Sequence, residues 1–404
     1  MTVTITDIEL ARERLRGIVK PTPLLKSATL DRMLEAEVFI KPENLQKTGS
    51  FKIRGAYNRI VSLSREELAR GVIAASAGNH GQAIAYAATC AGAKATIVMP
   101  EAAPIAKVDA TRGYGQTVVL KGADYQEAHR EAEAIRERSG AIFVDAYDDP
   151  FVIAGQGTLG LEIAEEVQPD AVLVPVGGGG LIAGVAVALA GRAAGAALIG
   201  VEAAGSPQLS ISLKAGRAAS VDQPVDTIAD GLATGRIGSL TFELIRKHLR
   251  QAVTVDDFEI GEAVLLMLER MKLLVEGAGA AALAGALKIR NELKVKRVVI
   301  VASGGNIDIN LLDRIIGHGL VKVGRLMRLT IDLRDRAGEL GKLLVALGAM
   351  GANVRSIRHD RVRPDIGIGS AQVMIELETR GLKHVEAIRR GLHESGWAIS
   401  SHSE

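Results

Sequence analysis

Aromatic residues are scarce in this chain of 404 residues, which contains six phenylalanines, five tyrosines and one tryptophan. Such a composition offers little material for stacking nucleic-acid bases. The charges are nearly balanced as well, with 49 Lys and Arg against 47 Asp and Glu and a net charge of +2. No basic domain is therefore expected, and nucleic acid is not an expected partner.

Cysteine and long hydrophobic runs are also lacking. Cys90 is the single cysteine, which excludes an intramolecular disulfide framework and a cysteine-rich zinc site. The longest apolar windows, around 181–195, are rich in Gly and Ala and are interrupted by Arg192, so they fall short of a membrane span of roughly 20 residues. Residues 1–5 show no basic stretch followed by an apolar run. We therefore expect a cytoplasmic protein without membrane contact.

Glycine is in surplus, with 45 copies, and Ala, Val, Ile and Leu must form most of the core. Short β-branched runs alternate with helix-length segments over most of the chain, and apolar runs without a polar face are typical of a parallel sheet covered on both sides. Predicted strands are Val38–Lys41, Val72–Ala75, Ala95–Met99, Thr117–Leu120, Ile142–Val144, Ala171–Val176, Leu198–Val201 and Arg297–Ala302. Predicted helices include Asp7–Val19, His80–Ala91, Tyr125–Ser139 and Asp257–Leu273. The pattern predicts an α/β protein with its chemistry at the carboxyl ends of the strands.

The pattern changes after about Gly324, and we predict a domain boundary near 322–325. The order that follows is strand, helix, two strands, helix and strand, which is a ferredoxin-like βαββαβ unit of about 80 residues. Its predicted elements are Leu326–Leu333, Gly338–Met350, Asn353–Asp360, Ala371–Glu378, Leu382–Glu394 and Trp397–Ser400.

The first of four glycine-containing turns is S-F-K-I-R-G-A at 50–56. A lysine at the start of a predicted helix is usually a solvated surface charge, and the motif alone favours that interpretation for Lys52. Its neighbours Phe51 and Ile53 are apolar, however, so Lys52 could instead lie in a pocket wall. Burial would lower its pKa and make it a nucleophile or a base.

The second turn, A-S-A-G-N-H-G-Q at 75–82, follows a predicted strand directly. Small residues at a helix N-terminus expose backbone N–H groups that favour an anion such as a carboxylate. Asn79 could donate a hydrogen bond to a phenolate-like oxygen. An equally weighted alternative is a simple capping turn, with Asn79 as the cap and His80 facing solvent.

The third turn, V-G-G-G-G-L at 176–181, follows a fully apolar predicted strand. Four consecutive glycines let successive N–H groups converge on a phosphate at a helix N-terminus. An alternative is the dinucleotide fingerprint Gly178-x-Gly180-x-x-Ala183, with Glu202 as the ribose-binding acid. That fingerprint belongs to the opening strand of a nucleotide domain, whereas here it lies in mid-chain.

The fourth turn, V-A-S-G-G-N at 301–306, follows another apolar strand. Ser303 either caps the next helix or offers a neutral hydroxyl to a heterocycle nitrogen. In their order along residues 1–320, the four motifs together resemble the threonine dehydratases. These are pyridoxal-phosphate enzymes of the tryptophan-synthase-β fold type, and the tail resembles an ACT regulatory domain.

The resemblance implies a two-lobed catalytic unit over 1–323, with a smaller lobe at roughly 45–150, and an ACT domain over 324–404. Lys52 would hold pyridoxal phosphate as a Schiff base and later remove the substrate's α-proton. The substrate carboxylate would bind the loop of Ser76, Ala77, Gly78, Asn79 and His80. The cofactor would be bound by Phe51, Lys52, Asn79, Gly177, Gly178, Gly179, Gly180, Gly231 and Ser303.

In this resemblance Asn79 meets the ring 3′-oxygen, Gly231 lies against a ring face and Ser303 meets the pyridine nitrogen. A neutral Ser303 favours loss of the β-hydroxyl over transamination. The implied reaction converts L-threonine to 2-oxobutanoate and ammonia, and L-serine to pyruvate, in isoleucine biosynthesis. A homo-oligomer, a tetramer, is the implied assembly.

Two positions depart from related patterns. Serine racemases carry a second serine where this chain has Ala77, so racemisation is expected to be weak. Glu202 matches a cation-binding glutamate of some relatives, but Gln208 stands where an acidic partner is expected. A single carboxylate is a poor divalent site, so we predict no metal and interpret Glu202 as a surface acid at a strand end.

In the tail, D-R-A-G-E-L at 335–340 and G-A-N-V at 351–354 resemble the effector loops of ACT domains, with Ala337 where Pro is usual. Isoleucine or valine would be the effector, bound near Gly338, Glu339, Leu340 and Asn353. The alternative is a purely oligomerising domain. Other hypotheses are an L-serine dehydratase or serine-racemase-like enzyme, a nicotinamide-dependent oxidoreductase, and a non-catalytic amino-acid sensor.

Overall fold

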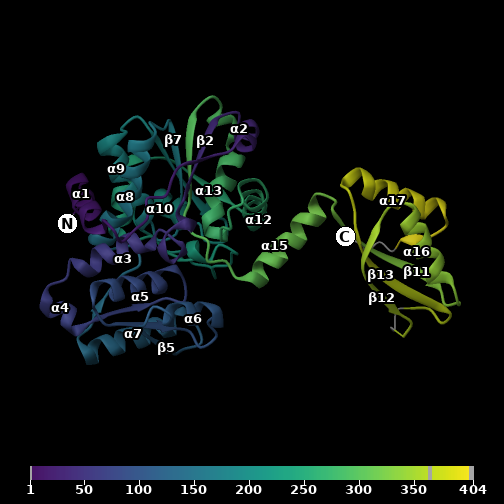
Figure 1. Ribbon diagram of the computed structural model, residues 1–404, viewed down its shortest axis with the longest axis horizontal. Helices are drawn as coiled ribbons and strands as arrows, with labels where there is room; N and C mark the ends of the chain where they lie inside the picture. Colours follow the sequence, from purple (N-terminus) through teal and green to yellow (C-terminus); the bar gives the residue numbers. More distant parts are fainter. Residues whose placement is uncertain (1, 363–365, 400–404) are drawn as a thin grey trace. The chain divides into compact units, whose positions relative to one another are not determined.

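The computed structural model describes residues 2–362 and 366–399. Contacts between residues divide the chain into two compact units, 1–308 and 309–404 (Figure 1). The boundary that the sequence pattern predicts near residues 322–325 lies C-terminal to this division. Helix α15 (Ile309–Lys322) belongs to the second unit, because its main contacts are with strand β11 (Leu326–Arg334).

A four-stranded parallel sheet forms the smaller lobe of the first unit, in the order β5-β4-β3-β6. Alternate residues face opposite sides of the sheet: Ile73 and Val98 pack against α7, whereas Ala74 and Ile97 pack with α3 and α5. Burial on both faces explains the continuous apolar runs. The strands are β3 (Val72–Ala75), β4 (Ala95–Met99), β5 (Thr117–Leu120) and β6 (Ile142–Phe143). The helices are α3 (Lys52–Val61), α4 (Arg65–Arg70), α5 (Asn79–Ala91), α6 (Ile105–Arg112) and α7 (Tyr125–Ser139).

A six-stranded sheet forms the larger lobe, in the order β1-β2-β10-β7-β8-β9, and only the β1–β2 pair is antiparallel. Its strands are β1 (Leu25–Lys26), β2 (Glu37–Pro42), β7 (Ala171–Pro175), β8 (Ala197–Ala203), β9 (Leu249–Val255) and β10 (Arg297–Ala302). The sequence patterns did not predict β1 or β9. Both are edge strands, and β9 is only half-buried and carries Arg250 and Gln251, so neither shows an apolar run.

The helices of the larger lobe are α1 (Ile5–Leu15), α2 (Ala28–Leu34), α8 (Pro150–Glu166), α9 (Gly180–Arg192), α10 (Gln208–Ala215), α11 (Ser239–His248), α12 (Asp257–Leu266), α13 (Gly277–Lys288) and α14 (Arg290–Leu293). Short 3₁₀ turns are η1 (Glu43–Leu45), η2 (Lys47–Gly49) and η3 (Asp230–Leu232). The helix predicted over 257–273 is α-helical only to Leu266 and continues as one π-helical turn, η4 (Met267–Met271).

Glycine lets helices α8 and α9 pack backbone to backbone in the larger core. A Cβ atom on Gly184 would lie 2.5 Å from the backbone nitrogen of Gly157, and one on Gly160 would lie 2.7 Å from the Cβ of Ala188. Part of the glycine surplus therefore serves close helix packing, in a core with few aromatic side chains.

The second unit contains a four-stranded antiparallel sheet in the order β12-β13-β11-β14. The remaining elements are α16 (Glu339–Ala349), β12 (Asn353–Asp360), β13 (Ser370–Glu378), α17 (Leu382–Glu394) and β14 (Ala398–Ile399). Leucines of α16 and apolar residues of α17 share one core with β11 and β13, so both helices cover the same sheet face. This confirms the predicted βαββαβ order, although Ser400, the end of the last predicted strand, lies outside the described residues. None of the described helices is long and apolar enough to cross a membrane.

Candidate active site

A cavity of about 840 Å³ lies between the two lobes of the first unit. Every residue that the sequence singled out for the cofactor or the substrate carboxylate lines it, whereas Glu202 does not. Those lining residues are Phe51, Lys52, Ser76, Ala77, Gly78, Asn79, His80, Gly177, Gly178, Gly179, Gly180, Gly231 and Ser303. The four motifs therefore meet at one place, although the first begins at residue 50 and the fourth at residue 301.

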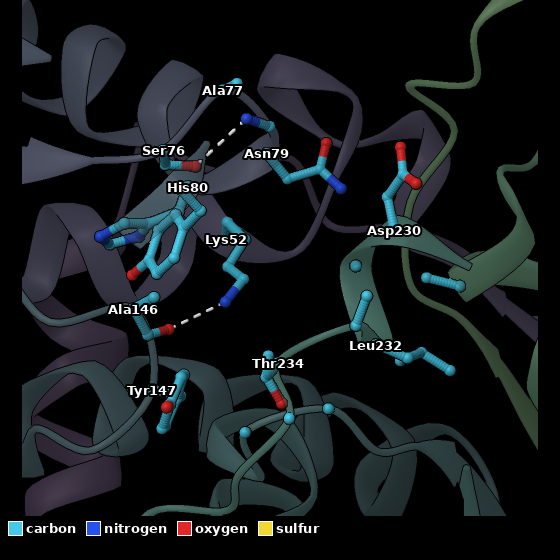
Figure 2. Close-up of a pocket in the computed structure, with 18 of the residues that line it drawn as sticks. Lys52, Ser76, Ala77, Asn79, His80, Ala146, Tyr147, Asp230, Leu232 and Thr234 are labelled. Atoms are coloured by element: carbon cyan, nitrogen blue, oxygen red, sulfur yellow. Dashed lines mark hydrogen bonds between the residues drawn. The ribbon is translucent and has the colours of Figure 1, made fainter. Parts of the chain in front are cut away.

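Lys52 is the first residue of α3, and its side chain projects into the cavity (Figure 2). Its Nζ donates a hydrogen bond of 2.8 Å to the carbonyl oxygen of Ala146 and lies 5.3 Å from the centre of the Phe51 ring. Burial lowers the pKa of Lys52 to about 8, against a smaller opposing effect of Asp145 and Glu276. The surface-charge interpretation of this lysine is therefore wrong: the amine is half-buried and can be neutral near physiological pH.

The loop between β3 and α5 presents Ser76, Ala77 and Gly78 to the cavity, and Gly78 precedes the first residue of α5. The Ser76 hydroxyl accepts a hydrogen bond from the Gly78 N–H at 3.2 Å. The alternative interpretation of the next two residues, a simple capping turn with Asn79 as the cap and His80 facing solvent, is wrong. The Asn79 side chain donates to Glu276 instead of capping the helix, and His80 is 6% exposed instead of facing solvent.

His80 is held by its ring nitrogen Nε2, which lies 2.9 Å from the carbonyl oxygen of Val144. Burial, with a smaller contribution from nearby Lys52, lowers the pKa of His80 to about 4. The imidazole is thus neutral at pH 7, and it contributes no positive charge to the carboxylate loop.

The four glycines Gly177 to Gly180 join β7 to α9. A Cβ on Gly178 would lie 2.3 Å from ring atoms of Tyr147, and Gly179 has a φ of +95° in the left-handed region. Both positions therefore require glycine. The first N–H groups of α9 have no partner within the helix and favour an anion at this edge of the cavity.

Gly231 and Ser303 lie near the start of α13. A Cβ on Gly231 would lie 3.0 Å from the Cβ of Ala278. Ser303, 4% exposed, donates to the carbonyl oxygen of Ala278 at 3.3 Å, and the same O–H can rotate to donate to an unprotonated ring nitrogen.

Glu276 is a site residue that the sequence analysis missed. It lines the cavity, and its carboxylate accepts a hydrogen bond of 2.6 Å from the Asn79 amide. Burial raises the pKa of Glu276 to about 7, against the opposing effect of the Asn79 hydrogen bond. The available clue was an acid directly before the small residues of Gly277–Gly279, at the start of a helix.

Glu202 is fully buried, so its interpretation as a surface acid is wrong. Its carboxylate accepts hydrogen bonds from the N–H groups of Leu209 at 2.7 Å and Ser210 at 3.0 Å, and from the Ser210 hydroxyl. These partners belong to the first turn of α10, where a carboxylate is favourable. With both oxygens occupied, Glu202 is not placed to bind a ribose, and no cluster of metal-ligating side chains occurs in the described ranges.

The structure separates the tail residues predicted to bind an effector: Gly338, Glu339 and Leu340 lie at the N-terminal end of the second unit's helix α16, whereas Asn353 follows its C-terminal end. Gly338 has a φ of +90° directly before this helix, and Glu339 forms an ion pair of 2.7 Å with Lys342. Asn353, at the start of β12, donates to Glu378 at 2.9 Å. A separate cavity of about 370 Å³ in this unit is lined by α15 and the sheet, including Arg314, Arg328 and Arg355.

The large cavity fits pyridoxal phosphate chemically. It offers a half-buried amine of lowered pKa, a helix N-terminus lined by glycines for the phosphate, and a neutral serine hydroxyl for a ring nitrogen. A side chain at Gly178 or Gly179 would fill part of this cradle or displace its walls.

Known proteins resemble this chain over nearly all of its length. It is 48% identical to an L-threonine ammonia-lyase of Thermotoga maritima over 98% of this chain and 99% of that protein. It is 43% identical to a catabolic L-threonine dehydratase of Staphylococcus aureus over 79% of this chain and 93% of that protein.

The structure of maize serine racemase superposes with a TM-score of 0.74 at 34% identity, covering 80% of this chain and 99% of that one. Residues 15–304 match the family described as pyridoxal-phosphate dependent enzyme, and this match includes every residue that lines the two-lobed cavity except Asn306. Together with the chemistry of the cavity, this family match rules out a nicotinamide-dependent oxidoreductase. The chain belongs to the family of pyridoxal-phosphate dependent enzymes.

Proposed function

We propose that this chain uses pyridoxal phosphate to convert L-threonine to 2-oxobutanoate and ammonia, and L-serine to pyruvate and ammonia. The observation that carries the proposal is Lys52, a half-buried amine of pKa about 8 in a cavity it shares with a glycine-lined helix N-terminus. The 48% identity to an L-threonine ammonia-lyase over almost the whole chain supports the choice of substrate.

Each cavity residue has a distinct part in this proposal. Lys52 holds the cofactor and, once free and neutral, takes the α-proton of the substrate. The loop Ser76–His80 binds the substrate carboxylate through its backbone N–H groups, and Gly177 to Gly180 bind the phosphate. Asn79, oriented by Glu276 and Asn306, faces the ring 3′-oxygen, and Ser303 faces the ring nitrogen.

Bound pyridoxal phosphate supplies an electron sink for the charge left at the substrate's α-carbon. The reaction removes the α-proton and the β-hydroxyl as water, and one water molecule then enters as ammonia leaves. Purified protein with pyridoxal phosphate and L-threonine is expected to form 2-oxobutanoate and ammonia in equal amounts. Chromatography of the oxo acid measures this directly, and no 2-oxobutanoate from the wild-type protein would reject the proposal.

Racemisation is expected to be weak because Ala77 provides no proton donor in the carboxylate loop. Replacing Ala77 with serine is expected to raise D-serine formation from L-serine at least roughly tenfold, because a hydroxyl there can exchange a proton with the α-carbon. Chiral chromatography measures D-serine, and Ala77→Gly is the matched control because it alters the same position without adding a hydroxyl. Equal D-serine formation by the Ser and Gly variants would contradict the role of this position.

We further propose that residues 324–404 regulate the enzyme as an ACT domain within the second unit, with isoleucine or valine bound near Gly338–Leu340 and Asn353. The separate core of this unit supports independent folding. The Staphylococcus dehydratase also supports a catalytic unit without a full tail, since the match takes in 93% of that protein but only 79% of this chain. The proposed assembly, a homotetramer, is measured by light scattering of the full chain.

A chain ending at Asp308 is expected to retain L-threonine turnover and to lose its response to isoleucine and valine. Allosteric coupling of roughly 1–3 kcal/mol would change the full-length enzyme's apparent affinity for threonine about 5- to 150-fold. Initial rates across threonine concentrations, with and without each effector, measure this change. The same rates are measured for full-length Asn353→Ala, which changes one predicted effector residue and keeps the whole second unit in the chain. An unchanged isoleucine response in the truncated chain would place the effector site elsewhere.

A further inference from the structure

We propose that Gln208 and Thr241 are positioning residues that hold the carbonyl groups of loop 176–178 away from the cavity and thereby set the affinity for the cofactor's phosphate. The inference deepens the proposed function, because it rests on the phosphate being bound at Gly177 to Gly180. Neither side chain lines the cavity, and both are fully buried behind the loop.

Gln208, the first residue of α10, directs its amide nitrogen at three carbonyl groups. Its Nε2 lies 3.3 Å from the oxygen of Val176, 3.1 Å from that of Gly177 and 3.3 Å from that of Leu232. Its Oε1 accepts a hydrogen bond of 2.5 Å from the Ser206 hydroxyl. The opposite amide orientation would bring Oε1 against three carbonyl oxygens, so this arrangement has one favourable orientation.

The third carbonyl group that Gln208 contacts, that of Leu232, lies outside the glycine loop. It belongs to η3, the same short turn as Gly231, which lines the cavity. One amide group therefore connects the end of β7 with the turn that we place against the cofactor ring. The turn is also held by its own backbone hydrogen bonds, from the Leu232 N–H to Ala229 at 2.7 Å and from the Ala233 N–H to Asp230 at 3.1 Å, so a change at Gln208 acts mainly on the glycine loop.

Thr241 acts on the next carbonyl along the loop. Its hydroxyl oxygen lies 2.8 Å from the oxygen of Gly178 and 3.0 Å from that of Gly238, and the N–H of Gly238 donates to the Gly178 oxygen at 3.1 Å. Thr241 is itself fixed, because Asp148 accepts from the N–H groups of Ser239, Leu240 and Thr241 at the start of α11.

The direction of three carbonyl groups determines the direction of three N–H groups. In a planar trans peptide the C=O of one residue and the N–H of the next point to opposite sides. With the carbonyls of residues 176–178 turned toward Gln208 and Thr241, the N–H groups of Gly177, Gly178 and Gly179 turn away from them. Glycines 177–179 line the cavity, so these donors are available to an anion there.

Glu202 has a function in this arrangement that needs no metal. Its carboxylate binds the N–H groups of Leu209 and Ser210, directly after Gln208. It therefore stabilises the helix start from which Gln208 reaches the loop, which accounts for a buried carboxylate outside the cavity.

The test compares pyridoxal phosphate with pyridoxal, which lacks the phosphate, in full-length apoprotein. Gln208→Met keeps a similar volume without a donor, and Thr241→Val replaces the hydroxyl with a methyl group. Each variant is expected to weaken binding of pyridoxal phosphate at least about tenfold, while its affinity for pyridoxal stays within about twofold of the wild type. Absorbance titration measures both dissociation constants.

Two further variants are the controls. Ser212 is also fully buried on α10, but its hydroxyl hydrogen-bonds with Ala219 and not with the loop. Ser212→Ala is expected to leave both dissociation constants unchanged, and Thr241→Ser, which retains the hydroxyl, is expected to bind pyridoxal phosphate like the wild type. Because Gln208 and Thr241 act on different carbonyls, failure of one variant to fold leaves the other as the test.

Unchanged affinity for pyridoxal phosphate in a folded Gln208→Met or Thr241→Val protein would overturn the inference. An equal loss of affinity for pyridoxal would overturn it too, because the effect would then not act through the phosphate. These outcomes differ from failure of the proposed function, in which the wild-type protein itself would not bind pyridoxal phosphate.

Discussion

Replacing Lys52 with alanine is expected to abolish formation of 2-oxobutanoate from L-threonine, with a fall in kcat of at least about 10³-fold. The variant loses the amine that holds the cofactor and the base that takes the α-proton. It also loses the visible absorbance that the wild-type protein shows when pyridoxal phosphate is attached to Lys52. Turnover assays and absorbance spectra of both proteins, at equal added cofactor, measure the two effects.

Lys107 is the matched control, because it is another lysine that lines the cavity. Its Nζ forms an ion pair of 3.4 Å with Asp230 instead of facing Ala146. Lys107→Ala is expected to retain the absorbance band and to keep kcat within about tenfold of the wild type. Retained turnover in Lys52→Ala, or an equal loss in both variants, would contradict the assignment of Lys52.

The pH dependence of cofactor uptake follows from the lowered pKa of Lys52. Only the neutral amine attacks a carbonyl carbon, and burial brings the pKa down to about 8. The rate of uptake by the apoprotein should therefore rise as pH increases toward 8 and level off above it. An unperturbed lysine would continue to gain reactivity up to about pH 10.4. Stopped-flow absorbance over this range distinguishes the two curves.

The cavity residues could be predicted from the sequence because each motif directly follows an apolar strand or opens a helix. Val72–Ala75 precedes Ser76, Ala171–Pro175 precedes Gly177, and Arg297–Ala302 precedes Ser303. Carboxyl ends of parallel strands meet at one edge of a sheet, so local patterns sufficed to bring these residues together. The strands of the antiparallel tail could be predicted as well, because β11 and β13 alternate between buried and less buried residues.

The residues that orient these groups could not be predicted in the same way, because their contacts join distant segments. Glu276 meets Asn79 across 197 positions of the chain, and Thr241 meets Gly178 across 63. Asn306, which also contacts Asn79, lies in the fourth motif, but Glu276, Gln208 and Thr241 lie in none of the four. Glu202 shows the same limit: the sequence places it at a strand end, but only the packing of α10 shows that it is buried.

Replacing Gly178 with alanine is expected to weaken binding of pyridoxal phosphate about 100-fold. The added Cβ would lie 2.3 Å from ring atoms of Tyr147, so either the ring or the loop must move. The loop cannot shift alone, because the Gly178 oxygen is held by Thr241 and Gly238. Titration of the apoprotein with the cofactor measures the change.

Gly195→Ala is the control for this substitution, because a Cβ at Gly195, just beyond the other end of α9, meets no atom within 4 Å. It is expected to bind the cofactor like the wild type.

The three atoms nearest to the added Cβ of Gly178→Ala all belong to the Tyr147 ring, so Tyr147→Ala in the same chain should restore part of the lost affinity. Restoration would attribute the loss to this one collision. A double variant as weak as Gly178→Ala would contradict the collision with Tyr147 as the cause, because Gly178 has no positive φ that an alanine would strain.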